Sequence, residues 1–143
     1  MTQMHLVLFV LTIALIASCD AFFARRINVS EERPDRREAL AESDAIARAV
    51  VRQYAAENNI PCDDKDQLPI ECWRQPIRIW ALRANNTLVF CYDAMGIPFE
   101  SKKFQRQMDR LQGMLQERFG TGAVSVSAGR CPSPPSSDQD GSP

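Results

Sequence analysis

Two stretches of the chain repeat their packing positions at the three- and four-residue spacing of an amphipathic helix. The first is formed by Leu40, Ser43, Ile46, Ala47, Val50 and Tyr54, and the second by Phe104, Met108, Leu111, Leu115 and Phe119. Asp35 and Glu38 have the spacing of a capping box, so the first helix should begin there and end at Asn58-Asn59. The second helix should end at Gly120.

Three shorter stretches have the character of strands. Ile77–Arg83 and Thr87–Tyr92 are rich in β-branched and aromatic residues, and Asn85-Asn86 between them favours a tight two-residue turn. This register places Ala81 opposite Phe90, Ile79 opposite Tyr92, Trp80 opposite Cys91 and Arg78 opposite Asp93. The last of these pairs is expected to be a surface ion pair. Residues 123–128 alternate, with Val124 and Val126 on one side, and should be the third strand.

The remaining segments show no such pattern. Residues 22–34 are polar and charge-dense and predict an unfolded leader, while residues 132–143 are rich in Pro, Ser, Asp and Gly and predict a disordered tail. Residues 62–76 lack periodicity and predict a loop. The prediction is one α+β domain over residues 35–131, an α-β-β-α-β sandwich with two helices on one face of a three-stranded sheet.

The N-terminus has the layout of a signal peptide covering residues 1–21. An apolar run from Leu6 to Ala17 is followed by small residues, and at this length it is shorter than the ~20 residues that cross a bilayer. An uncleaved anchor over residues 4–24 would bury Asp20 in the span. One feature opposes export: Arg25 and Arg26 follow the apolar run, and no Lys or Arg precedes it.

Cleavage after Ala21 would leave four cysteines: Cys62, Cys72, Cys91 and Cys131. An even number in a small exported domain indicates two disulfides, for which three connectivities exist. We favour Cys62–Cys72, which closes a short loop, and Cys91–Cys131. A four-cysteine zinc site is disfavoured because structural zinc ligands usually come in close pairs, and no CxxC pair occurs.

Charge and composition argue against several functions. The net charge is −1, and no basic field marks a nucleic-acid surface. The one histidine, His5, would leave with the signal peptide, so no imidazole would remain for a catalytic relay or a metal. We therefore expect neither an enzyme nor a cofactor. A hydrolase using carboxylates of Asp63, Asp64 and Asp66 is a weaker alternative to a solvated acidic loop.

Trp73, Trp80 and Tyr92 are the candidates for a protein-recognition surface, because Trp, Tyr and Arg dominate binding hot spots. The alternative for Trp80 is a structural role, covering the outer face of the sheet.

The N-terminus resembles that of secreted oomycete effectors with an RxLR-EER host-entry motif. Glu31-Glu32-Arg33 matches the EER half, and Arg25-Arg26-Ile27-Asn28 is similar to a degenerate RxLR element with Asn28 where the family has arginine. The resemblance covers residues 1–33. It implies a secreted, non-enzymatic virulence protein that reaches the host cell and binds a host protein.

A second resemblance is to bacterial lipoproteins. Ile16-Ala17-Ser18-Cys19 is similar to a lipobox, which implies acylation of Cys19. The protein would then be a periplasmic inhibitor, immunity or assembly factor, in contact with the membrane only through this lipid. Glycan at Asn28 or Asn85, each in a sequon, would instead indicate a eukaryotic secretory route.

Overall fold

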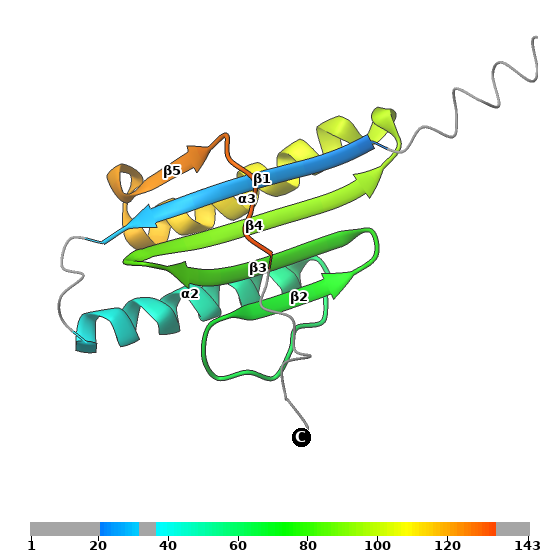
Figure 1. Cartoon of the computed structure of the whole chain (residues 1–143). Coiled ribbons are helices and arrows are strands. Elements are labelled where there is room, and N and C mark those ends of the chain that lie inside the picture. The colour runs from blue at the N-terminus through cyan, green and yellow to red at the C-terminus, as the bar shows by residue number, and fades with distance from the viewer. Residues whose placement is uncertain (1–20, 32–36, 134–143) are drawn as a thin grey trace, which may run out of the picture.

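A computed structural model describes residues 21–31 and 37–133, which form two helices packed on a five-stranded antiparallel sheet (Figure 1). In chain order the elements are β1 (Ala21–Ser30), α2 (Arg37–Glu57), β2 (Ile70–Arg74), β3 (Ile77–Ala84), β4 (Thr87–Gly96), η1 (Pro98–Glu100), α3 (Ser101–Phe119), η2 (Thr121–Ala123) and β5 (Val124–Ser127). The strand order is β2-β3-β4-β1-β5. Both helices cover the same face, as expected for the predicted α+β sandwich, but the sheet has five strands rather than three.

The predicted leader over residues 22–34 is wrong for its first part, because Ala21–Ser30 is strand β1. This strand lies inside the sheet, paired with β4 along its full length and with β5. Phe23, Ile27 and Val29 face the helices, and Arg25 shares that face. Two adjacent arginines hide this alternation in the sequence. The fold therefore includes residues 21–30, which precede the predicted domain start at residue 35, while residues 32–36 lie outside the described part.

The predicted loop over residues 62–76 is wrong for residues 70–74, which form strand β2. Ile70 and Cys72 are fully buried and β2 pairs with β3 at the sheet edge. A five-residue strand is too short to show a clear period in sequence.

The predicted helices are present with close to their expected bounds. Asn59 ends the first with a φ of 55°, and Gly120 follows the second with a φ of 90°, the positive values typical of helix ends. Asp35 of the expected capping box lies outside the described residues. The buried faces contain the predicted side chains from Ala47 to Tyr54 in α2 and from Phe104 to Leu115 in α3.

The β3–β4 hairpin has the predicted register, with all four expected residue pairs opposite one another. Asn85 in the turn has a φ of 55°, as a tight turn requires. The expected Arg78–Asp93 ion pair is replaced by one with Glu71, where Arg78 Nε lies 2.5 Å from Glu71 Oε1. The Glu71 carboxylate comes from β2, which the sequence pattern does not predict.

The main core lies between the sheet and the helices, and a smaller apolar cluster of Trp80, Val89 and Cys91 lies on the opposite, open face. Both favoured disulfides are present, Cys62–Cys72 and Cys91–Cys131. They tie the edge strand β2 to the preceding segment and the C-terminal segment to β4.

Apart from β2, the element order is β-α-β-β-α-β, that of the ferredoxin-like fold. Folds of this kind carry many unrelated functions, so the topology alone argues for none. Neither of the helices in the described ranges is long and apolar enough to cross a membrane.

Candidate functional site

The open face of the sheet is crossed by residues 128–133, which we call the strap and which follow β5 in Figure 1. Three contacts fix it. Cys131 is bonded to Cys91 of β4, and the Trp80 indole Nε1 donates a hydrogen bond to the Pro132 carbonyl at 2.9 Å. Arg26 Nη1 donates to the carbonyl of Arg130 at 3.0 Å. The strap is thereby held across β1, β4 and β3.

A groove of about 560 Å³ lies between the strap and the sheet. Its floor and walls include Phe22, Ala24, Arg26, Arg78, Trp80 and Asp93 together with residues 127–131 and 133. Alternation along the strands places these side chains on the open face, because their neighbours in sequence point into the main core. The groove is thus built from β1, the β3–β4 hairpin, the end of β5 and the strap, so three separate parts of the sequence meet there.

The polar groups of the groove are mainly arginines and one carboxylate. The Arg78 guanidinium lies over the Trp80 ring, 5.2 Å from its centroid, which fixes its orientation. Burial raises the pKa of Asp93, and the charge of Arg78 opposes this in part. Guanidinium groups bind carboxylates, and a half-buried carboxylate accepts hydrogen bonds from cationic and amide groups, so this lining suits a polar or charged ligand.

The three residues predicted to form a recognition surface are separated by the fold. Only Trp73 is exposed, at 59%, on β2. Trp80 is buried under the strap, which agrees with its alternative structural role, and Tyr92 is fully buried on the helix side. The Tyr92 hydroxyl donates to Gln107 Oε1 of α3 at 2.6 Å, and burial raises the pKa of Tyr92. The prediction of an interaction surface is therefore wrong for Trp80 and Tyr92.

Residues 25–28, which resemble a degenerate RxLR element, are part of β1, an interior strand of the sheet. Ile27 is fully buried, and Arg25 Nη1 binds Asp109 Oδ1 of α3 at 2.6 Å. The Asn28 side-chain oxygen accepts a hydrogen bond from Arg26 Nε at 3.1 Å. Four neighbouring side chains of the proposed motif therefore make contacts within the fold.

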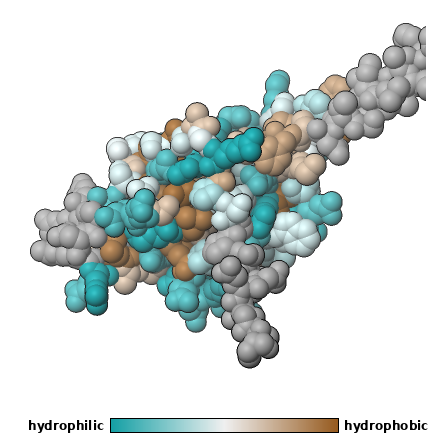
Figure 2. All heavy atoms as spheres, in the orientation of Figure 1, coloured by the Kyte–Doolittle hydropathy of each residue, from teal (hydrophilic) through white to brown (hydrophobic). Residues whose placement is uncertain are grey.

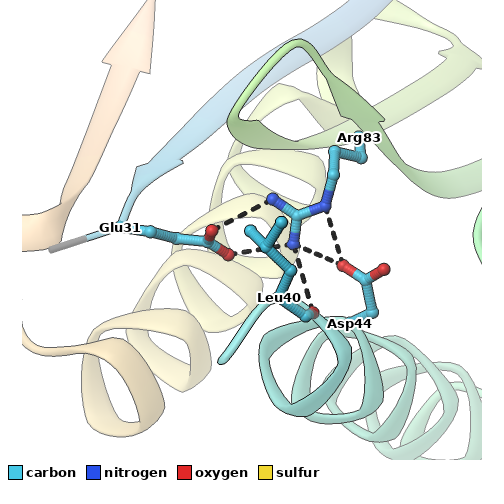
Figure 3. Close-up of polar contacts among 4 residues, drawn as sticks. All are labelled: Glu31, Leu40, Asp44 and Arg83. Atoms are coloured by element: carbon cyan, nitrogen blue, oxygen red, sulfur yellow. Dashed lines mark hydrogen bonds and ion pairs between the residues drawn. The ribbon is translucent and has the colours of Figure 1, made fainter. Parts of the chain in front are cut away.

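Glu31 of the EER triplet also has a partner within the domain, as Figure 3 shows. Its two carboxylate oxygens accept hydrogen bonds from Arg83 Nη1 and Nη2 at 3.1 and 2.9 Å. Arg83 also donates to Asp44 and to the Leu40 carbonyl of α2. Burial opposes the charge of Arg83, but the hydrogen bonds to Glu31 and Asp44 outweigh it and raise the pKa of the guanidinium. This cluster joins Glu31, the residue after β1, to β3 and α2.

Other candidate residues fall in different places. Glu32, Arg33 and the lipidation candidate Cys19 lie outside the described residues. Asn28 is half-buried inside the sheet, whereas Asn85 is exposed in the hairpin turn, so only Asn85 offers an accessible glycosylation position.

The acidic loop has no sign of a metal centre. Asp63 Oδ2 accepts a hydrogen bond from the Glu71 amide at 3.4 Å, and Asp64 and Asp66 are exposed. Within residues 21–31 and 37–133, no group of three or more His, Cys, Asp or Glu side chains is placed to hold a metal ion.

Sequence reasoning missed the groove arginines and the strap. The signal for the strap was present in the Cys91–Cys131 pairing, because that bond must carry residues near 131 onto β4. The groove itself depends on β1, which the charge pattern disguises as a leader. Comparison of the chain with known protein families, with curated proteins and with solved structures found no match.

Proposed function

We propose that this chain is an exported, non-enzymatic binding protein, anchored to the periplasmic face of a bacterial membrane through an acylated Cys19. The observation that carries the proposal is the start of β1 at Ala21, two residues after Cys19. The whole strand then survives processing at Cys19, and every residue that the structure describes is kept. The two disulfides further support export, because disulfides form and persist in oxidising compartments.

The contacts of β1 favour this proposal over a host-delivered effector. A host-entry signal has to be read by another protein from accessible chain, whereas Ile27 is fully buried and Glu31 is 8% exposed in its pair with Arg83. Exposing these residues to a receptor would require β1 to leave the sheet. Disulfides would also be reduced in a host cytosol.

We further propose that the groove and the exposed Trp73 bind the protein partner. Trp73 pairs with Arg78 across β2 and β3, and Arg78 pairs with Asp93 across β3 and β4, so the three side chains form one row on the open face. Such a row offers an aromatic anchor, a cation and an anion to one segment of a partner.

Intact mass of the native protein tests the anchor. We expect a mature chain that begins at Cys19 and carries a lipid, and a Cys19→Ser variant that is neither cleaved there nor acylated. A mature chain that begins at Phe22 without lipid would contradict the anchor and favour the soluble effector.

Site-specific photocrosslinking in the native host tests the binding surface. A photoreactive residue at position 73 should give a defined crosslinked species, and the same residue at Gln53, exposed on α2 on the opposite side, should not. Equal yields at the two positions would count against the open face.

A further inference from the structure

Four exposed apolar side chains gather at one end of the sheet, which we call the apolar end. Phe22, Met95, Ile97 and Phe99 are 64%, 54%, 42% and 91% exposed. Phe22 lies opposite Met95 across β1 and β4, and Ile97 and Phe99 follow β4 within the next few residues. Figure 2 shows apolar side chains beside the start of β1.

The segment that presents Ile97 and Phe99 is held in place by its neighbours. A Cβ at Gly96 would come within 2.6 Å of the Phe104 ring and of Glu100, so glycine there allows α3 to approach the end of β4 closely. Phe104 in turn packs on Phe23, with ring centroids 4.8 Å apart. The Glu100 amide donates to the Ile97 carbonyl at 3.0 Å, which closes the turn between them. The outward position of Phe99 is thus set by the fold.

Contiguous exposed apolar side chains mark an interaction surface, whereas single ones do not. The first turns of α3, directly after this segment, carry exposed Lys102, Lys103 and Arg106. Lys103 also pairs with Glu100 at 3.7 Å. Aromatic side chains flanked by lysine and arginine are typical of protein surfaces that rest in the interface of an anionic bilayer.

The position of the N-terminal segment indicates what the apolar end binds. Ala21 pairs with Gly96 at the centre of the apolar end, and Cys19 is two residues earlier, at most about 7 Å of extended chain. A lipid on Cys19 would bring a bilayer within that reach, and insertion of the apolar run from Leu6 to Ala17 would bring it within about 14 Å, because Ala17 is four residues before Ala21. A free partner protein explains neither this proximity nor the basic flank.

We infer that the apolar end rests in the lipid interface, with Phe22 and Phe99 inserted among the headgroups. This inference rests on the export stated above, but it does not depend on the chemistry of the anchor. The strands then run away from the bilayer, and the Asn85-Asn86 turn lies about 30 Å beyond it, because β1 spans ten residues and ends opposite that hairpin. The open-face groove would face the side, accessible to a partner.

Depth-dependent quenching tests the orientation. The full chain is isolated with its native N-terminus in a Trp73→Phe background, where buried Trp80 gives a constant signal, and is mixed with phosphatidylethanolamine–phosphatidylglycerol vesicles. The new tryptophan in Phe99→Trp should be quenched by brominated lipid and protected from aqueous acrylamide. The new tryptophan in the control Asn86→Trp should behave in the opposite way. Equal acrylamide quenching of the two would overturn the inference.

A second measurement separates this inference from the proposed anchor. If the isolated chain carries no lipid, vesicle binding itself reports on the apolar end, and Phe99→Asp should weaken it about tenfold or more while Asn86→Asp leaves it unchanged. That result would refute acylation and support the apolar end. Absence of vesicle binding by the unacylated chain would overturn the inference. So would a dimer in solution that protects the introduced indole of the Phe99→Trp variant from acrylamide without vesicles.

Discussion

The Glu31–Arg83 pair predicts that a residue of the apparent EER motif stabilises the fold. Glu31→Gln keeps the size of the side chain but removes the charge that faces Arg83. Hydrogen bonds to charged groups contribute about 1.5–3 kcal/mol each when partly buried, and the Glu31 side chain is 8% exposed. Asp44 still binds Arg83 in the variant, so we expect the free energy of unfolding to fall by about 2 kcal/mol, near the lower end of this range.

The chain contains a control in the Glu57–Arg110 pair, which also has two hydrogen bonds between one guanidinium and one carboxylate but lies on the surface. Those side chains are 37% and 49% exposed, so Glu57→Gln should leave the unfolding midpoint unchanged. Thermal unfolding followed by circular dichroism should show a midpoint about 8 °C lower for Glu31→Gln. Equal midpoints for the two variants would refute the reasoning, because burial is the main difference between the pairs.

Two further predictions concern the open face. Asp93→Asn should raise the unfolding midpoint near neutral pH. Burial raises the pKa of Asp93 above its usual 3.8, so the folded state holds the proton more tightly than the unfolded state, and wild-type stability falls as the pH rises above 3.8. Below that pH the carboxyl is protonated in both states, and the stability advantage of the variant should disappear. Melting curves across this range check the sign, and an advantage that persists at low pH would contradict it. Cys131→Ser removes a disulfide between residues 40 positions apart, and the chain-entropy model sets the resulting loss of stability at about 4 kcal/mol. The substitution should also release the strap from Trp80. Tryptophan emission should shift to the red, and unchanged emission would show that the strap stays closed without the bond.

The elements with a strong internal period could be predicted, and those whose partners are distant could not. Both helices repeat apolar side chains over several turns, and the β3–β4 hairpin is fixed by its own turn at Asn85, so local chemistry sets its register. The short loop between Cys62 and Cys72 favoured that pair, which left Cys91 and Cys131 as the second pair. Strand β2 has only five residues, and its burial depends on β3 and on the Cys62–Cys72 bond.

Strand β1 was missed for an electrostatic reason. Two arginines in its centre are typical of a solvated leader, and nothing local shows that their charges have partners. Asp109 of α3 neutralises Arg25 at a sequence separation of 84, and the Arg130 carbonyl accepts from Arg26 at a separation of 104. Only the folded chain brings these groups together, so the groove that depends on β1 was also beyond prediction.

The position of β1 limits how the N-terminus can be processed. Removal of residues up to Cys19 leaves every β1 pair intact, whereas a cut after Ala24 would remove four of the ten β1–β4 pairs and the Phe23–Phe104 contact. The effector resemblance treats residues 25–33 as an accessible signal, yet residues 25–28 lie in strand β1 inside the sheet, whereas the lipoprotein resemblance involves only residues 16–19. Of the two candidate signals, Cys19 precedes β1 and can be processed without disturbing that strand, whereas residues 25–28 become accessible only if β1 leaves the sheet.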